Sequence, residues 1–195
     1  MPQRNTKDAI KEACLRLLEE KPLSQITVKA IVNECGINRN SFYYHYSDIP
    51  TLLNEIVMDS ADRIIAAHAK AETLEECLAA ATEFARENKR AVLHVFKSVN
   101  RDIYEQNLAM VCHDLVAAYW RTILGDAVHQ ISQEDRDIMV RFYQCELMGQ
   151  ILLWLESDMR YDIQKQFARL CELRENFGQE MIRRSIQSNS ETESI

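Results

Sequence analysis

The chain has 195 residues, a formal net charge of -7 and a hydrophobic content of 47%, which is ordinary for a globular protein. Its four glycines and three prolines supply too few turns for a β-rich fold, so we expect an all-α protein. No apolar run reaches the roughly 18 residues of a membrane span, and no secretory segment opens the chain, so we expect a cytoplasmic protein.

Three short helices are predicted at the amino end. Asn5 or Thr6 can cap a helix that continues to about Glu20, because its apolar residues recur at i, i+3 and i+4. Lys21-Pro22 ends this helix, since the residue before proline disfavours helical angles. Thr27 can cap a second helix. Gly36 suits the turn that follows it, and Asn38 can cap a third helix over 39–44.

The third helix is crowded with polar and aromatic side chains, a pattern that simple packing does not require. A helix that enters the major groove of DNA needs groups of this kind. Phe42 and Tyr46 are expected to be buried, whereas the other side chains of the helix are expected to face outward. The second and third helices therefore predict a helix-turn-helix DNA-binding domain over residues 1–47.

A longer, helical part is predicted to follow. Ser47 or Asp48 begins a fourth helix, which tolerates Pro50 in its first turn and connects to the rest of the chain near Lys70. Further helices are predicted over 73–88, opened by a capping box, and over 90–99, 103–124, 132–156 and 162–185. Residues 48–187 form the predicted ligand-binding and dimerisation domain, and residues 188–195 a disordered acidic tail.

The stretch from Ile26 to Leu53 resembles the N-terminal DNA-binding domain of TetR-family transcriptional regulators. The similarity lies in the threonine cap, the Ala-Ile pair, the Cys-Gly turn, the Phe-Tyr-x-His-aromatic end and the paired leucines of helix four. It implies a homodimer that binds a palindromic operator and responds to an unknown small-molecule effector, most commonly as a repressor. The remaining residues resemble the family only in their helical layout.

The resemblance also implies a role for each matching residue. Thr27 and Lys29 lie where helix two meets a phosphate of double-stranded DNA. Asn38, Arg39 and Asn40 begin the recognition helix, so they can reach base edges or phosphates. Ser41 allows close approach, and three further residues lie where the family contacts the backbone or a thymine methyl: Tyr43, Tyr44 and His45. The family's usual lysine at the start of helix four is replaced by Ile49-Pro50.

Charge is unevenly divided along the chain. Residues 1–50 carry 7 Lys/Arg and 6 Asp/Glu, whereas residues 51–195 carry 16 and 24. The acidity therefore lies away from the predicted DNA-reading segment, and screening confines its field to about 8–10 Å. The basic balance of +1 and the missing lysine leave one alternative open, a regulator of the same fold that acts through a protein partner.

Two residue sets are assigned to the second domain. Pocket-lining candidates are aromatic, histidine and methionine side chains, although each is also typical of a core or surface position: His68, His94, Phe96, Tyr104, Met110, His113, Tyr119 and Trp120. The family layout implies that the last two long helices pair with their copies in a dimer, through Ile138, Phe142, Cys145, Gly149, Leu152, Phe167, Leu170 and Phe177.

Beyond these two sets, the sequence contains no recognisable catalytic or metal-binding motif. No nucleophile–base spacing, phosphate loop or metal motif is present, so we expect neither an enzyme nor a bound cofactor or metal. The six cysteines are evenly spread without paired spacing, which is typical of small core residues in a reducing compartment.

Overall fold

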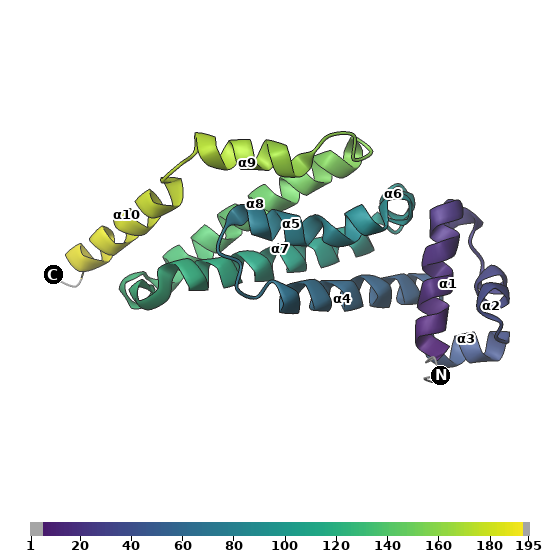
Figure 1. The fold of residues 1–195 in the computed structure, drawn as a ribbon. Coiled ribbons are helices and arrows are strands. Elements are labelled where there is room, and N and C mark those ends of the chain that lie inside the picture. The colour runs from purple at the N-terminus through teal and green to yellow at the C-terminus, as the bar shows by residue number, and fades with distance from the viewer. Residues whose placement is uncertain (1–5, 193–195) are drawn as a thin grey trace. The chain divides into compact units, whose positions relative to one another are not determined.

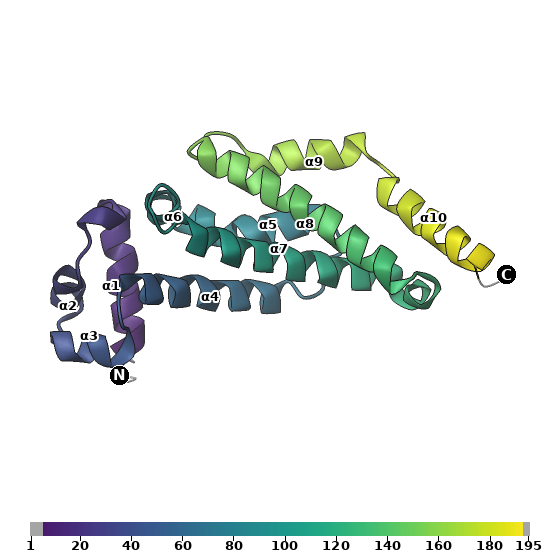
Figure 2. The ribbon, with the colours of Figure 1, turned by 180° about the vertical axis from the view of Figure 1, so that it is seen from behind.

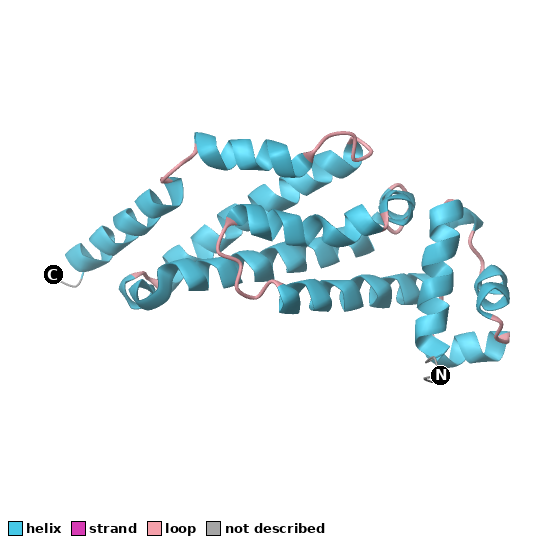
Figure 3. Cartoon of the chain, in the orientation of Figure 1, coloured by secondary structure: helices cyan, strands magenta, loops and turns pink. Residues whose placement is uncertain are grey.

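The computed structural model describes residues 6–192 of the chain, and within that range it contains helices and no strands (Figure 3). Its α-helices are α1 Thr6–Glu20, α2 Val28–Cys35, α3 Arg39–His45, α4 Ile49–Ala67, α5 Leu74–Glu87, α6 Lys89–Phe96, α7 Arg101–Leu124, α8 Gln133–Glu156, α9 Ile163–Leu173 and α10 Phe177–Thr192. Short 3₁₀ helices lie at Leu23–Gln25 and Gly125–Gln130. None of the described helices is long and apolar enough to cross a lipid bilayer. The all-α prediction is confirmed.

The chain divides into two compact units. The first contains the described part of residues 1–63 together with 83–108, and the second contains 64–82 and the described part of 109–195. The first unit thus extends past the boundary predicted at residue 47, because it also includes α6 and the adjoining parts of α4, α5 and α7.

In the first unit, α1 packs against α2, α3 and α6 (Figure 1). Its predicted apolar stripe is buried, with Ile10, Ala13, Cys14, Leu17 and Leu18 in the core. Polar bonds fasten its last turn to α6: the Leu18 carbonyl lies 2.7 Å from His94 Nδ1, and the Glu19 carboxylate accepts the Ala91 N–H at 3.1 Å. Since Asn88 makes no side-chain cap, Glu19 satisfies an N–H at the start of α6 in its place.

In the second unit, α9 runs beside α8, as Figures 1 and 2 both show. The buried face of α8 carries Met139, Tyr143, Leu147, Ile151, Trp154 and Leu155. The predicted caps form: Ser132 accepts the Asp135 N–H at 3.1 Å, and Thr73 accepts the Glu76 N–H at 3.1 Å.

The helix predicted over 162–185 is broken in two. Residues 174–176 separate α9 from α10, and Asn176 has a positive φ of 67°, which cannot continue a helix. The turn lets Gly178 approach closely, since a Cβ there would lie 3.3 Å from Tyr143 Oη and 3.7 Å from the Trp120 ring. Helix periodicity did not reveal this break because both segments share one amphipathic pattern.

Two other helix ends differ from the predictions. Helix α4 ends at Ala67, before the predicted Lys70. Helix α10 continues to Thr192, into the segment predicted to be a disordered tail from residue 188. Asn189 donates to the Gln130 carbonyl at 3.0 Å, which anchors this last part of the helix. The remaining tail residues 193–195, and the predicted cap Asn5, lie outside the described residues.

Candidate DNA-binding site

The scaffold of the site is the turn between α2 and α3. Thr27 Oγ1 accepts the Ala30 N–H at 3.2 Å and so caps α2. Gly36 has φ 71° and ψ 29°, and the Ile37 N–H then reaches the Val32 carbonyl at 3.0 Å. A residue with a side chain would be strained at this φ, so glycine fixes the angle at which α3 leaves α2.

Helix α3 is short, and it is stabilised by a cap at its first turn and by buried aromatic rings toward its last turn. Asn38 Oδ1 accepts the Ser41 N–H at 2.8 Å and the Ser41 hydroxyl at 3.1 Å. Phe42 and Tyr46 are buried, as predicted, with their ring centroids 5.9 Å apart. A helix of seven residues is unstable by itself, so these contacts keep it in place.

The remaining residues of α3 are exposed or half-buried. Arg39 and Asn40 are exposed, Tyr44 is 84% exposed, and Tyr43 is 52% exposed. Ser41 and His45 are half-buried. On α2, Lys29 is exposed too. The structure therefore places all nine predicted contact residues on one helix-turn-helix and buries none of them.

The hydrogen bonds limit what some of these residues can offer to DNA. Asn38 uses its carbonyl as a cap, so its amide can still donate to a phosphate but cannot form the paired bonds to N6 and N7 of an adenine. Ser41 donates its hydroxyl proton to Asn38. Within residues 6–192, Arg39 and Asn40 show no hydrogen bond or ion pair, and their full sets of donors stay available.

A charged cluster that the sequence analysis missed holds α1 against α4 behind the recognition helix. Glu55 lies 2.7 Å from Lys11 Nζ and 3.0 Å from Lys7 Nζ, and it accepts the Tyr46 hydroxyl at 3.2 Å. Lys11 also pairs with Asp59. The signal was present in the sequence, because two lysines and two carboxylates each recur at i, i+4.

The cluster shifts the titration of its members. The hydrogen bond from Lys11 lowers the pKa of Glu55 to about 2, despite partial burial. Burial raises the pKa of Tyr46, and its bond to Glu55 acts in the same direction. Burial opposes the charge of Lys11, but the bonds from Asp59 and Glu55 outweigh it, so the pKa of Lys11 is also raised. All three groups keep their ordinary charge at neutral pH.

Comparison with known proteins agrees with this geometry. Residues 10–56 match the model of "Bacterial regulatory proteins, tetR family", and residues 72–176 match that of "Transcriptional regulator C-terminal region", a TetR-type domain. The chain belongs to the TetR family of transcriptional regulators. The DNA-binding helix-turn-helix that the sequence predicted is thereby confirmed.

Solved structures share the TetR fold at low sequence identity. The dihydroxyacetone kinase operon activator DhaS superposes with a TM-score of 0.68 at 16% identity, covering 88% of this chain and 94% of that one. The fatty acid degradation regulator FadR from Bacillus halodurans gives 0.62 at 14%, covering 89% and 96%. A tetR-family regulator from Streptomyces coelicolor gives 0.58 at 15%, covering 94% and 91%. No match was found among the curated proteins.

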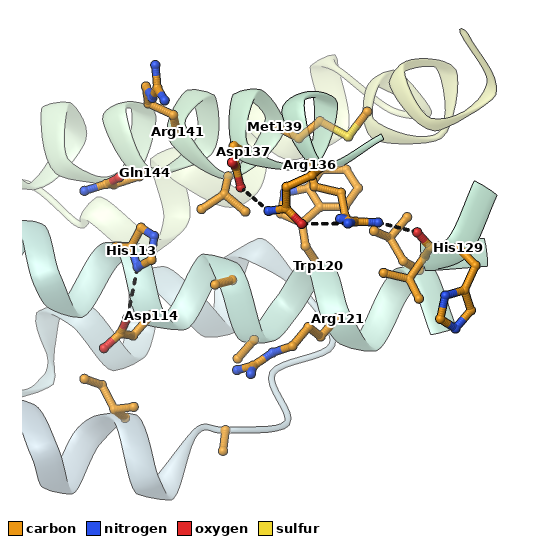
Figure 4. A pocket seen from close by; sticks show the side chains of 18 residues that line it. His113, Asp114, Trp120, Arg121, His129, Arg136, Asp137, Met139, Arg141 and Gln144 are labelled. Carbon is orange, nitrogen blue, oxygen red and sulfur yellow. Dashed lines mark hydrogen bonds and ion pairs between the residues drawn. The ribbon is translucent and has the colours of Figure 1, made fainter. Parts of the chain in front are cut away.

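The predicted pocket residues of this TetR-family chain do not gather at one place. His113 and Trp120 line a pocket of about 990 Å³ in the second unit, between α7 and α8 (Figure 4). Tyr119 lines a smaller pocket of about 270 Å³, which Trp120 also borders. In the first unit, His94 bonds the Leu18 carbonyl, and two residues belong to the buried core: Phe96 and Tyr104. His68 and Met110 are half-buried and line neither of these two pockets.

The predicted dimer residues divide into exposed and buried sets. Ile138, Phe142, Cys145 and Phe177 are exposed, whereas Gly149, Leu152 and Leu170 are half-buried. Phe167 is only 2% exposed, so its side chain is not available for the dimer interface to which it was assigned. It belongs to the inner face of α9, where the Arg174 guanidinium lies 5.6 Å from its ring. Leu153 and Leu173 are exposed as well, although neither was among the predicted dimer residues.

Proposed function

We propose that this TetR-family chain is a ligand-responsive repressor of the cytoplasm that binds a palindromic operator as a homodimer. The observation that carries the proposal is the outward row of donors and aromatic rings on α3, held rigid by buried Phe42 and Tyr46. Such a helix fits the major groove, where Arg39 can donate to both guanine acceptors and Asn40 can pair with adenine. Lys29 and Thr27 would hold phosphates at the start of α2. No catalytic role is proposed.

The homodimer is supported by a second apolar face on α8. Ile138 and Phe142 are 50% and 45% exposed, and Cys145, Gly149 and Leu152 continue the row at alternating steps of three and four. The opposite face of the helix is already in the core. Exposed apolar rows of this spacing pair with a second copy in helical bundles. Two heads joined in this way would match a palindromic site.

The ligand response would act as a shift between two dimer states. An effector can release DNA only if it binds the non-reading state more tightly. Helix α4 is the proposed connection, because its first part belongs to the unit that holds α3 and its last residues belong to the unit that holds the large pocket.

The DNA-binding role is tested by fluorescence anisotropy with duplexes from the upstream region of the protein's own gene. Arg39→Ala should cost about 1–3 kcal/mol at the cognate site and relax discrimination at one base pair. Lys29→Ala should weaken binding to all duplexes and lower the salt slope by about one unit. Arg90→Ala, an exposed arginine of α6, is the control and should change neither. Failure to capture any duplex would refute the proposal.

The dimer is tested by sedimentation of Phe142→Glu. A charge within the apolar row should shift the protein toward monomer, because burying it unpaired is costly. Val99→Glu is the matched control, since Val99 is an exposed apolar residue in the loop before α7. A Phe142→Glu protein that sediments as a dimer would exclude this face as the interface.

A further inference from the structure

Trp120 on α7 carries a polar group without a partner in the described part of the chain. Its side chain is 3% exposed, and no residue of 6–192 accepts a hydrogen bond from its Nε1–H. The other tryptophan, Trp154, donates its Nε1–H to the Tyr161 carbonyl at 3.0 Å. Buried donors without acceptors are rare in folded proteins because they lose their bonds to water. An acceptor supplied by a bound molecule would resolve this exception.

The Trp120 ring borders two pockets of the second unit, which differ in charge. The pocket of about 990 Å³ is lined by Arg121, Arg136 and Arg141 against Asp114 and Asp137, a balance of +1. The pocket of about 270 Å³ has Glu72, Glu75 and Glu175 against Arg174, a balance of -2.

This contrast decides which pocket could take an anion. The second unit as a whole is acidic, with 10 Lys/Arg and 17 Asp/Glu in residues 64–82 and 109–195. The larger pocket is therefore a locally positive site in an acidic unit. Of these two pockets, only the larger one has a local field that would favour a negatively charged molecule.

Arg136 lines the same pocket as Trp120 (Figure 4), and among the described residues it bonds neutral acceptors alone. Its guanidinium donates to the Val128 carbonyl at 2.5 Å, the Ile131 carbonyl at 2.8 Å and Gln133 Oε1 at 2.6 Å. These bonds fix the orientation of the side chain, and no carboxylate among the described side chains pairs with its charge. The neighbouring carboxylate of Asp137 bonds Gln133 instead, at 2.7 Å.

Part of the pocket wall is apolar. Ala118 and Leu124 of α7 and Met139 of α8 line it, and all three are buried. A ligand that satisfied both kinds of wall would carry a charged oxygen group at one end and an apolar body at the other.

We propose that the pocket between α7 and α8 binds a small organic anion, a carboxylate or a phosphate with an apolar body. One of its oxygens accepts the Trp120 N–H, and Arg136 compensates its charge. This inference rests on the proposed ligand response and gives that ligand a chemical class. It also assigns Arg136 a binding role that the sequence analysis did not find.

The test uses the indole N–H signals of the ¹⁵N-labelled full-length chain. The chain has two tryptophans, so its spectrum contains two such signals, and Trp154→Phe assigns them. Octanoate and octyl phosphate are the probes, with octanol and octylamine as controls of equal chain length. At a few millimolar, at least one anion should move the Trp120 signal downfield, and octanol and octylamine should not. The Trp154 N–H is already bonded to the Tyr161 carbonyl, so its signal is the internal reference.

Two variants, titrated with the effective anion by isothermal calorimetry because Trp120→Phe lacks the Trp120 signal, measure the contribution of each group. Trp120→Phe keeps a ring and removes the donor, and Arg136→Gln removes the charge, so each should weaken binding of the effective anion about tenfold. Arg160→Gln, an exposed arginine outside the pocket, should leave it unchanged. If Arg136→Gln does not fold, Arg136→Lys keeps the charge and should retain most of the affinity.

The outcomes separate the two proposals. A Trp120 signal that neither anion moves, or that octanol moves equally, overturns the anion site, as does full affinity in Trp120→Phe. The spectrum needs no DNA. If the anion binds but no duplex is captured, the pocket assignment stands and the proposed repressor function fails. If DNA binds but no anion does, the pocket assignment fails alone.

Discussion

Glu55 provides the strongest test of how the charged cluster holds the DNA-reading helix. Its carboxylate joins Lys7 and Lys11 of α1 to α4 and accepts the hydroxyl of Tyr46, the residue directly after α3. The substitution Glu55→Gln keeps an oxygen for Tyr46 but removes the charge that both lysines face. We expect the variant to fold and to be less stable at neutral pH.

The size of the effect follows from the pKa of Glu55. The bonds from Lys11 and Lys7 lower that pKa from 4.5 to about 2. A shift of this size would correspond to at most about 3.4 kcal/mol of folding free energy. The side chain is 29% exposed, so solvent screening reduces the contribution. We expect Glu55→Gln to lose about 1–2 kcal/mol at pH 7.

The pH dependence has a defined sign. A carboxyl whose pKa is lower in the folded state stabilises the protein above its unfolded pKa of 4.5. That contribution is lost as the pH falls toward the folded value of about 2. Urea unfolding of both proteins at several pH values should therefore show a difference that is constant near neutrality and vanishes in acid.

Glu180 supplies a matched control. Its pKa is also lowered to about 2, by Arg183 and Arg184, but its side chain is 39% exposed and both partners lie within one turn of the same helix, α10. Surface pairs of this kind contribute little to stability, so Glu180→Gln should unfold like the unchanged protein. Equal losses in the two variants would refute the reasoning that the position of Glu55 between α1 and α4, and not the pKa shift alone, makes its cluster stabilising. So would a Glu55 effect that is independent of pH.

Three further substitutions test other contacts. Arg174→Met should cost about 3–5 kcal/mol in thermal unfolding, because it leaves the half-buried Glu146 without its partner, and adding Glu146→Leu should recover most of the loss. Glu19→Ala should cost about 1 kcal/mol of unfolding free energy, since it removes the acceptor for the first turn of α6. Asn38→Ala should lower the helicity of α3, which hydrogen exchange at the Ser41 amide measures. It should also weaken binding to all DNA duplexes by the same factor. An unchanged exchange rate would show that the Asn38 cap does not stabilise the helix.

Much of the first unit could be predicted from the sequence because its signals are local. Thr27, Gly36 and Asn38 each act on a backbone group within four residues, so their types alone indicate where α2 and α3 begin and end. The buried pair Phe42 and Tyr46 followed from their spacing on one short helix. The Glu55 cluster was missed because its partners lie 44 and 48 positions away in the chain.

The pocket could not be located from the sequence. Aromatic and histidine residues were chosen by type, yet His94 serves as a bond between α1 and α6, and Trp120 borders the cavity. What distinguishes Trp120 is that no described residue accepts its N–H, and that depends on everything packed around the indole. The sequence likewise does not reveal that the Arg136 guanidinium bonds backbone carbonyls, which leaves its charge available to a ligand.

Helix α8 shows why the sequence alone does not distinguish an apolar row on the surface from one in the core. It has two opposed apolar faces, one with Ile138 and Phe142 and the other with Tyr143 and Leu147. Periodicity detects both rows but cannot tell which one packs inside the chain, because that depends on where α7 and α9 lie. The structure puts Tyr143 and Leu147 in the core and leaves Ile138 exposed. An apolar row left in water after the core is complete has to be covered by another molecule to contribute to stability, and a second copy of α8 offers the same row in return.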